Sequence, residues 1–389
     1  MSGPLTKSIV DLLPQEQGNF VGRIYDPARE KPVPVAYANN GFFDLSNYAS
    51  SMSSLLELDD LAEIIGSVVQ QGEPTWTASD VVSAYGVSEV RPSQTTLLAP
   101  IDLQVVKACG VTFAGSMIER VIEERAGGDV ARADTIRAEV AASIGADIGN
   151  VKPGSEESAR VKAALKEKGW WSQYLEVGLG PDPEVFTKAP VLSSVGTGDH
   201  IGIPKFSEWN NPEPELALLV TGSGAIRGAT LANDVNLRDV EGRSALLLGM
   251  AKDNNRSCAV GPLIRLFDDS FTIDDARSLQ IHLKVTGTDG YVLDGLNSVD
   301  QLSRTFEELV AAALGDHHQY PDGFLLMTGT LFAPTEDRDE PGNGFTHKIG
   351  DQVEISSSAI GKLVNEVGQS EELPPWTYGL REFYSDLSR

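Results

Sequence analysis

Two acids stand two positions apart at the start of an apolar run, in the stretch NPEPELALLV. Side chains two apart on an extended strand point to the same face, so Glu213 and Glu215 should lie side by side. Carboxylates that close repel one another unless a proton or a cation lies between them. A third acid, Asp234, follows in the segment ANDVNLRD, where a turn or strand end would present it. Three carboxylates from two adjacent strands favour Mg²⁺, with Mn²⁺ or Ca²⁺ as alternatives, over zinc or copper.

A lysine follows eighteen residues after Asp234, in the segment MAKDNNRSCAVGP. A nearby cation disfavours the ammonium form of a lysine, so Lys252 could transfer protons near neutral pH. Each feature taken alone also has a plainer interpretation. The two acids can be a solvated strand edge, and Lys252 can be a surface lysine in a loop.

The segments that must position these residues differ in kind along the chain. Residues 20–46 and the region from 172 onward contain short strand patterns broken by glycine and proline turns. Between them, three amphipathic helical patterns are separated by glycine-rich breaks. We therefore predict an α+β, β-rich fold with a small N-terminal α/β domain over residues 1–100. The catalytic domain would span 101–389, with a helical insertion at about 115–170 that forms a lid or an ordinary covering subdomain.

The composition restricts the partners and the location of the protein. The net charge of −25 argues against nucleic acid and anionic membranes, because binding them requires a basic surface. No apolar run approaches the roughly 20 residues of a membrane span, and the N-terminal segment lacks a signal-peptide pattern. Cys109 and Cys258 are the only cysteines, too few for a disulfide framework. We expect a cytoplasmic protein that acts on a small molecule.

The order and spacing of the candidate residues resemble the fumarylacetoacetate hydrolase superfamily. That family has an E-x-E pair and then an aspartate in an N-D-x-[ST]-x-R-D motif, which match Glu213-Pro214-Glu215 and residues 233–239. Its lysine run ending in G-P matches residues 252–262. The resemblance implies a mixed β-sandwich roll, a homodimer or homotetramer, and Mg²⁺ held by Glu213, Glu215 and Asp234. Shorter family motifs match Phe186 to Lys188, Gly196 to Asp199, Gly329-Thr330, Gly350 to Ile355 and Gly361 to Val367.

One stretch departs from the hydrolases of this family. They have a G-L-N-Y-x-x-H motif whose histidine activates water for carbon–carbon bond cleavage, whereas the stretch GVTFAGS places Ser116 at that position. Serine cannot replace imidazole as a base at neutral pH. The departure resembles the sugar-acid dehydratase branch of the family. That branch implies dehydration of a 2-keto-3-deoxy-D-pentonate to 2-oxoglutarate semialdehyde (2,5-dioxopentanoate) in non-phosphorylative pentose catabolism.

The resemblance also implies roles for individual side chains. Glu119, at the position of a second family acid, and Lys252 are candidates for the proton transfers of a dehydration. Arg238 would orient Asp234 or the substrate carboxylate, or would instead form a structural ion pair with a neighbouring acid. The hydroxyl groups expected to bind substrate oxygens belong to Ser116, Ser194 and Thr330.

Two other functions remain open at this point. The protein could be a hydrolase that cleaves a carbon–carbon bond of a 2,4-diketo acid, with a residue other than histidine positioning the water. It could also bind a metal and a keto acid without turnover, which Ser116 alone would favour. The products distinguish these functions, because dehydration keeps the carbon chain intact and hydrolysis divides it.

Overall fold

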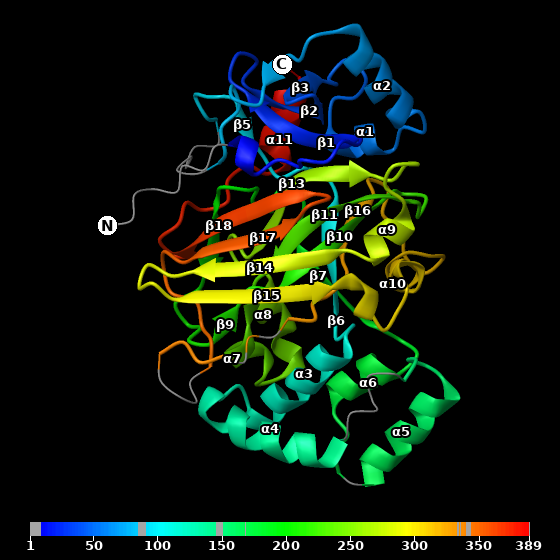
Figure 1. Ribbon diagram of the computed structural model, residues 1–389, viewed down its shortest axis with the longest axis vertical. Helices are drawn as coiled ribbons and strands as arrows, with labels where there is room; N and C mark the ends of the chain where they lie inside the picture. The colour runs from blue at the N-terminus through cyan, green and yellow to red at the C-terminus, as the bar shows by residue number, and fades with distance from the viewer. Residues whose placement is uncertain are drawn as a thin grey trace.

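The structure is a computed structural model that describes residues 9–84, 91–144, 151–167, 169–332, 334, 336–339 and 344–388. Within these residues a mixed eleven-stranded sheet forms the centre of the molecule (Figure 1). Ten of its strands follow one another in the order β4 (Trp76–Thr77), β3 (Gly41–Asp44), β2 (Lys31–Ala38), β1 (Phe20–Asp26), β13 (Cys258–Leu266), β11 (Ile226–Asp234), β10 (Pro214–Val220), β16 (Phe324–Met327), β6 (Val105–Gly110) and β7 (Glu184–Ala189). The eleventh strand, β5 (Thr96–Leu97), pairs with β1.

A second sheet of five strands contributes its apolar face to the same core. Its order is β15 (Val292–Ser298), β14 (Gln280–Thr286), β17 (Gln352–Ser357), β18 (Gly361–Gln369) and β8 (His200–Ile203). The alternating burial of β14 shows that one face of this sheet is covered and the other is exposed. The short strands β9 (Asn210–Asn211) and β12 (Asn236–Leu237) pair separately, beside the candidate site.

Strand β10 explains the apolar run that follows the paired acids. All its residues are buried, because the two faces of the strand contact two different hydrophobic clusters. Leu216 and Leu218 pack in the cluster that includes β14 and β17. Ala217 and Leu219 pack in a second cluster with Leu55. A strand covered on both faces needs a continuous apolar sequence rather than an alternating one.

Helices cover the ends of the roll. The block α3 (Ala114–Ala126), α4 (Val130–Ile144), α5 (Glu156–Glu167) and α6 (Gln173–Leu179) lies together at one end of the molecule (Figure 1). The first three helices fall in the predicted helical insertion, whereas α6 lies beyond it, where a strand pattern was wrongly predicted. No described helix combines the length and apolar character needed to cross a membrane. The helices are α1 (Met52–Leu56), α2 (Leu61–Gln71), α3 (Ala114–Ala126), α4 (Val130–Ile144), α5 (Glu156–Glu167), α6 (Gln173–Leu179), α7 (Arg238–Glu241), α8 (Leu248–Lys252), α9 (Ile273–Arg277), α10 (Phe306–Ala313) and α11 (Leu380–Leu387), with 3₁₀ turns at Ile9–Asp11, Ala245–Leu247 and Val299–Gln301.

The N-terminal strands continue the central sheet instead of forming a sheet of their own. Strand β1 pairs with β13 through Phe20 opposite Arg265 and Val21 opposite Ile264. The predicted boundary at residue 100 therefore separates parts of one hydrogen-bonded sheet, and the division into domains stays a prediction. The mixed sheets and modest helical content confirm the predicted α+β, β-rich fold class.

Candidate active site

Glu213, Glu215 and Asp234 meet where β10 and β11 are paired. The antiparallel register places Glu215 opposite Ala232, and the amide of Asp234 donates a hydrogen bond to the carbonyl of Glu213 at 3.1 Å. One carboxylate oxygen from each acid lies within 4.8 Å of the others. All three side chains are buried. The structure thus brings the three sequence-predicted ligands to one point, in a geometry that could hold a metal ion.

Two lysines neutralise part of this negative charge. Lys252, the last residue of α8, donates to Glu213 Oε2 at 2.6 Å and to Asp234 Oδ2 at 3.0 Å. Lys188 Nζ lies 2.8 Å from Asp234 Oδ1. Although burial opposes ionisation, these lysines hold the pKa of Asp234 below its ordinary value. Burial by itself would lower the pKa of Lys252. The charges of Asp234 and Glu213 outweigh burial and raise this pKa above its ordinary value, so the ammonium form is favoured.

Glu215 has a different environment from the other two acids. Its Oε2 accepts a hydrogen bond from the Gly329 amide at 2.6 Å, and among the described residues it makes no ion pair. Gly329 has a φ of 96° and approaches Thr112 so closely that only glycine fits. Burial first, and then the charges of Asp234 and Glu213, raise the pKa of Glu215 well above its ordinary value. A divalent cation fits this site, because it would relieve the repulsion that the lysines leave.

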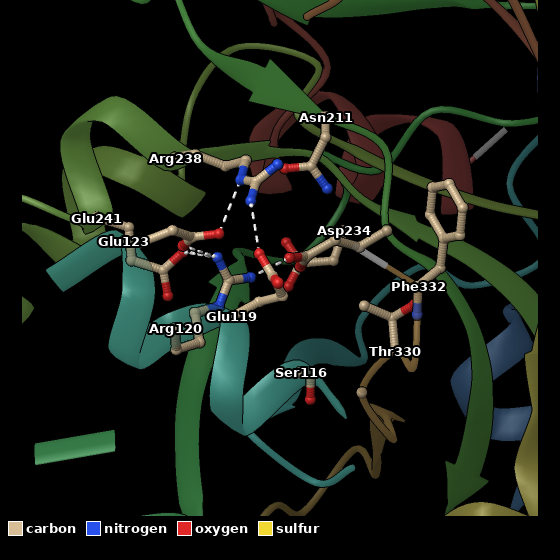
Figure 2. A network of polar contacts seen from close by, with 12 residues as sticks. Ser116, Glu119, Arg120, Glu123, Asn211, Asp234, Arg238, Glu241, Thr330 and Phe332 are labelled. Carbon is tan, nitrogen blue, oxygen red and sulfur yellow. Dashed lines mark hydrogen bonds and ion pairs between the residues drawn. The ribbon is translucent and has the colours of Figure 1, made fainter. Parts of the chain in front are cut away.

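A small pocket adjoins the three carboxylates. Two of the predicted substrate-binding hydroxyls line it. Ser116, in the first turn of α3, donates from Oγ to the carbonyl of Phe113 at 3.0 Å. Thr330 follows β16, and its Oγ1 accepts a hydrogen bond from the Phe332 amide at 3.1 Å (Figure 2). Lys252 also lines this pocket.

Glu119 lies on α3 but is not among the residues that line the pocket. Its two carboxylate oxygens accept hydrogen bonds from Arg137 Nε at 3.0 Å and Arg137 Nη2 at 2.9 Å. Arg238 Nη2 lies 3.6 Å from the same carboxylate (Figure 2). These contacts join α3 to α4 and α7, so they give Glu119 a role in holding the helices together.

Arg238 and Ser194 also lie outside the pocket lining. Arg238 Nε donates to Glu123 Oε1 at 2.7 Å, and its guanidinium stacks 4.2 Å above the ring of Trp209. Its acidic partners are therefore on α3, whereas the sequence suggested acids that neighbour it along the chain. Ser194 Oγ lies 3.4 Å from Cys258 Sγ.

Three charged residues that the sequence reasoning missed line the pocket: Arg120, Glu184 and Glu241. Arg120 stands four residues after Ser116, on the same face of α3. It binds Glu213, donates to Glu123 Oε2 at 2.6 Å and lies 3.1 Å from Glu241 Oε2 (Figure 2). The helical block is thereby tied directly to a candidate metal ligand. The i, i+4 spacing from Ser116 was the available signal.

Glu184 is the carboxyl group of the pocket with the most freedom to exchange a proton. It begins β7, and strand alternation places it on the same face as Phe186, which also lines the pocket. Its carboxyl group makes no hydrogen bond or ion pair to a described residue, and its Oε2 lies where a side chain at Gly110 would have to go. Burial, followed by the charge of Glu241, raises the pKa of Glu184 to about 7. Its two-residue spacing from Phe186 of the Phe-x-Lys motif was the signal that could have identified it.

A mixed β roll with a buried triad of carboxylates, beside a pocket that carries a protonatable acid, defines a class of enzyme site that could hold a metal ion. The family model described as "Fumarylacetoacetate (FAA) hydrolase C-terminal" matches residues 159–368. The match covers more than half of the chain, so the protein belongs to this family, and the predicted family membership is confirmed.

Three individual similarities are informative. The chain is 32% identical over 206 residues to a probable 2-keto-3-deoxyxylonate dehydratase of Haloferax volcanii, covering 53% of this chain and 67% of that protein. It is 35% identical over 191 residues to 2-dehydro-3-deoxy-D-arabinonate dehydratase of Saccharolobus solfataricus. This similarity covers 49% of this chain and only 60% of the length of that protein. A solved structure of 2-keto-3-deoxy-D-arabinonate dehydratase complexed with magnesium and 2,5-dioxopentanoate shares the fold, with a TM-score of 0.59, 24% identity, and coverage of 90% of this chain and 99% of that one.

Proposed function

We propose that the protein dehydrates a 2-keto-3-deoxy-D-pentonate to 2,5-dioxopentanoate and that Mg²⁺ binds to Glu213, Glu215 and Asp234. The observation that carries the proposal is the position of Glu184, a carboxyl group with a pKa of about 7 in the pocket that the three acids line. The dehydratase names of two relatives and the magnesium in the similar solved structure support it.

The metal site would bind the keto acid end of the substrate. A divalent cation bound to the three carboxylates supplies Lewis-acid stabilisation of negative charge on the substrate's carboxylate and 2-oxo oxygens. Lys252 and Lys188 keep Asp234 ionised and fix its direction. The hydroxyls of Ser116 and Thr330 provide hydrogen bonds to the remaining substrate oxygens.

Glu184 then performs the proton transfers of the elimination. Its carboxylate accepts a proton from C3 of the substrate, the bond between C4 and its hydroxyl oxygen breaks, and the new carboxylic acid returns the proton to the departing hydroxyl as water. A pKa near the working pH suits a group that must both accept and donate. A proton moves from C5 to C3, and the resulting enol tautomerises to the aldehyde. Lys252, held as ammonium, is a positioning and charge-stabilising group in this scheme, and Glu119 supports α3.

The hydrolase alternative lacks a base of the required kind. In the hydrolases that this chain resembles, a histidine activates the water. In this chain Ser116 occupies the position of that histidine. Among the described residues that line the pocket there is no histidine. We propose dehydration for this reason, and the cytoplasmic location and the homodimeric or homotetrameric state stay predictions.

Mass spectrometry of reaction products tests the function. The purified protein with Mg²⁺ should convert 2-keto-3-deoxy-D-xylonate into a product lighter by one water and with its carbon chain intact. EDTA should stop the conversion, and added Mg²⁺ should restore it. Two fragments from an acylpyruvate would establish the hydrolase instead. Binding of Mn²⁺ and keto acid without any product would establish a protein that has lost activity.

A further inference from the structure

A second cleft lies away from the carboxylate pocket, between the N-terminal strands and the segment that precedes α11. It has about 830 Å³ of space that protein atoms do not fill. Strands β1 and β5 and helix α11 lie at one end of the molecule, whereas α3 and α7 lie toward the other (Figure 1). No residue that lines this cleft also lines the carboxylate pocket.

Arg23 gives the cleft its chemical character. This arginine of β1 is 7% exposed, yet the only hydrogen bond that its side chain makes to a described residue runs from Nε to the Ala99 carbonyl at 3.2 Å. Its Nη1 is buried without a hydrogen-bond partner. A guanidinium has five N–H donors, and leaving them unbonded away from water is costly. Burial lowers the pKa of Arg23, with Asp102 and Tyr378 opposing that effect. Such a group requires an acceptor that the described residues do not supply.

The walls of the cleft add positive charge and apolar surface. Its charged lining consists of Arg23, Arg256 and Asp199, and Arg256 pairs with Asp199. The lining therefore carries one excess positive charge on a chain whose net charge is −25. Pro375 and the indole of Trp376, which is 48% exposed, form part of the apolar wall.

We propose that this cleft binds a small organic oxyanion, a carboxylate or phosphate monoester, whose anionic end accepts hydrogen bonds from Arg23 and whose flat apolar body packs against Trp376. Guanidinium groups match the paired oxygens of carboxylates and phosphates. The proposal is independent of the dehydratase reaction. Arg23 also lines a smaller cavity beside Asp102, where an ordered water would be the alternative partner.

Isothermal titration calorimetry with benzoate and phenyl phosphate tests the proposal and identifies which oxyanion is preferred. Acetate lacks the apolar body and benzyl alcohol lacks the charge, so both should bind at least about tenfold more weakly, which is 1.4 kcal/mol. Arg23→Met and Trp376→Ala should each weaken binding by at least about tenfold. Arg29→Met, at an arginine on the surface that pairs with Asp44, is the matched control and should bind normally. Asp234→Asn should also bind normally, because it alters the other pocket.

The stability of Arg23→Met separates a binding role from a structural one. The side chain of Arg23 makes one hydrogen bond, to Ala99, and its Nη1 has no partner, so its removal should leave the midpoint of urea unfolding nearly unchanged or raise it. A lower midpoint together with unchanged binding would make Arg23 structural and overturn the proposal. If neither benzoate nor phenyl phosphate binds at concentrations up to about 10 mM, the free N–H groups of Arg23 are assigned to water. This result would also overturn the proposal. Trp376→Ala, at an exposed position, keeps the test decisive if Arg23→Met does not fold.

Discussion

Lys188 Nζ lies 2.8 Å from Asp234 Oδ1, and both side chains are almost completely buried. Lys188 also donates to the carbonyl of Val235 at 3.0 Å and to the carbonyl of Lys252. One ammonium group therefore orients a candidate metal ligand and fixes the backbone of the residue that supplies the second cation. This arrangement makes the charge balance of the site depend on a strand, β7, that contributes no predicted ligand.

Lys188→Met should destabilise the protein by about 3–5 kcal/mol, because it leaves a buried carboxylate without its partner. The double variant Lys188→Met/Asp234→Asn should lose less than the sum of the two single variants. Urea unfolding followed by circular dichroism measures both quantities. Lys107→Met, at a partly exposed lysine on the neighbouring strand, is the control and should cost less than about 1 kcal/mol. Additive losses would show that Lys188 and Asp234 do not interact.

The carboxylate triad predicts a specific loss of metal binding. Glu213→Gln and Asp234→Asn each remove one of three oxygen ligands, so Mn²⁺ affinity measured by electron paramagnetic resonance should fall by at least about 100-fold, or 2.7 kcal/mol. Turnover should fall with it. Asp274→Asn, at an exposed acid that pairs with Arg277 on the surface, should leave both unchanged. Normal Mn²⁺ binding in the Glu213 and Asp234 variants would place the metal elsewhere.

A matched pair of substitutions can distinguish the roles of Glu184 and Glu119. Glu184→Gln should reduce kcat by about 10²–10⁴-fold, the usual contribution of a general acid–base group, while Mn²⁺ affinity is retained. Glu119→Gln should have a smaller effect on kcat, because Arg137 and Arg238 hold this carboxylate outside the pocket lining. A larger loss of kcat in Glu119→Gln than in Glu184→Gln would assign the proton transfers to Glu119.

The pH dependence of activity should report the ionisation of Glu184. Its carboxylate form accepts the C3 proton, and burial raises its pKa from 4.5 to about 7. Activity measured as kcat/KM should therefore increase as pH rises toward 7 and then level off. A pH profile of Glu184→Gln should lack this rise. An identical rise in the variant would assign the titration to another group.

The same pKa shift should appear in stability. The folded protein holds the Glu184 proton to about pH 7, whereas the unfolded chain releases it near 4.5. The stabilisation from the protonated group is therefore complete below pH 4.5 and is lost as pH rises to about 7. Unfolding free energies of the wild type should fall relative to Glu184→Gln across this window. A constant difference between the two proteins would mean that Glu184 has an ordinary pKa in the folded state.

Much of the candidate site could be predicted from local sequence. The two-residue spacing of Glu213 and Glu215 fixes their common face once the strand is recognised, because strand alternation is a local property. The residue pattern also made Asp234 and Lys252 candidates, and the family order of motifs then supported both. The apolar run after Glu215 also indicated a buried strand, and β10 is buried on both faces.

What the sequence by itself determined was therefore the set of candidate ligands and the class of fold. Only the tertiary structure decided which charged groups share the pocket, because these contacts join residues far apart in the chain, such as Arg120 and Glu213, which are 93 positions apart. Spacing alone could not show that Arg137 binds Glu119 or that the Glu184 carboxyl group has no partner among the described residues. The pKa of an acid depends on burial and on charges from other elements, and these exist only when the chain is folded. In the candidate site, the side-by-side arrangement of the two acids of NPEPELALLV is the feature that residue spacing could determine.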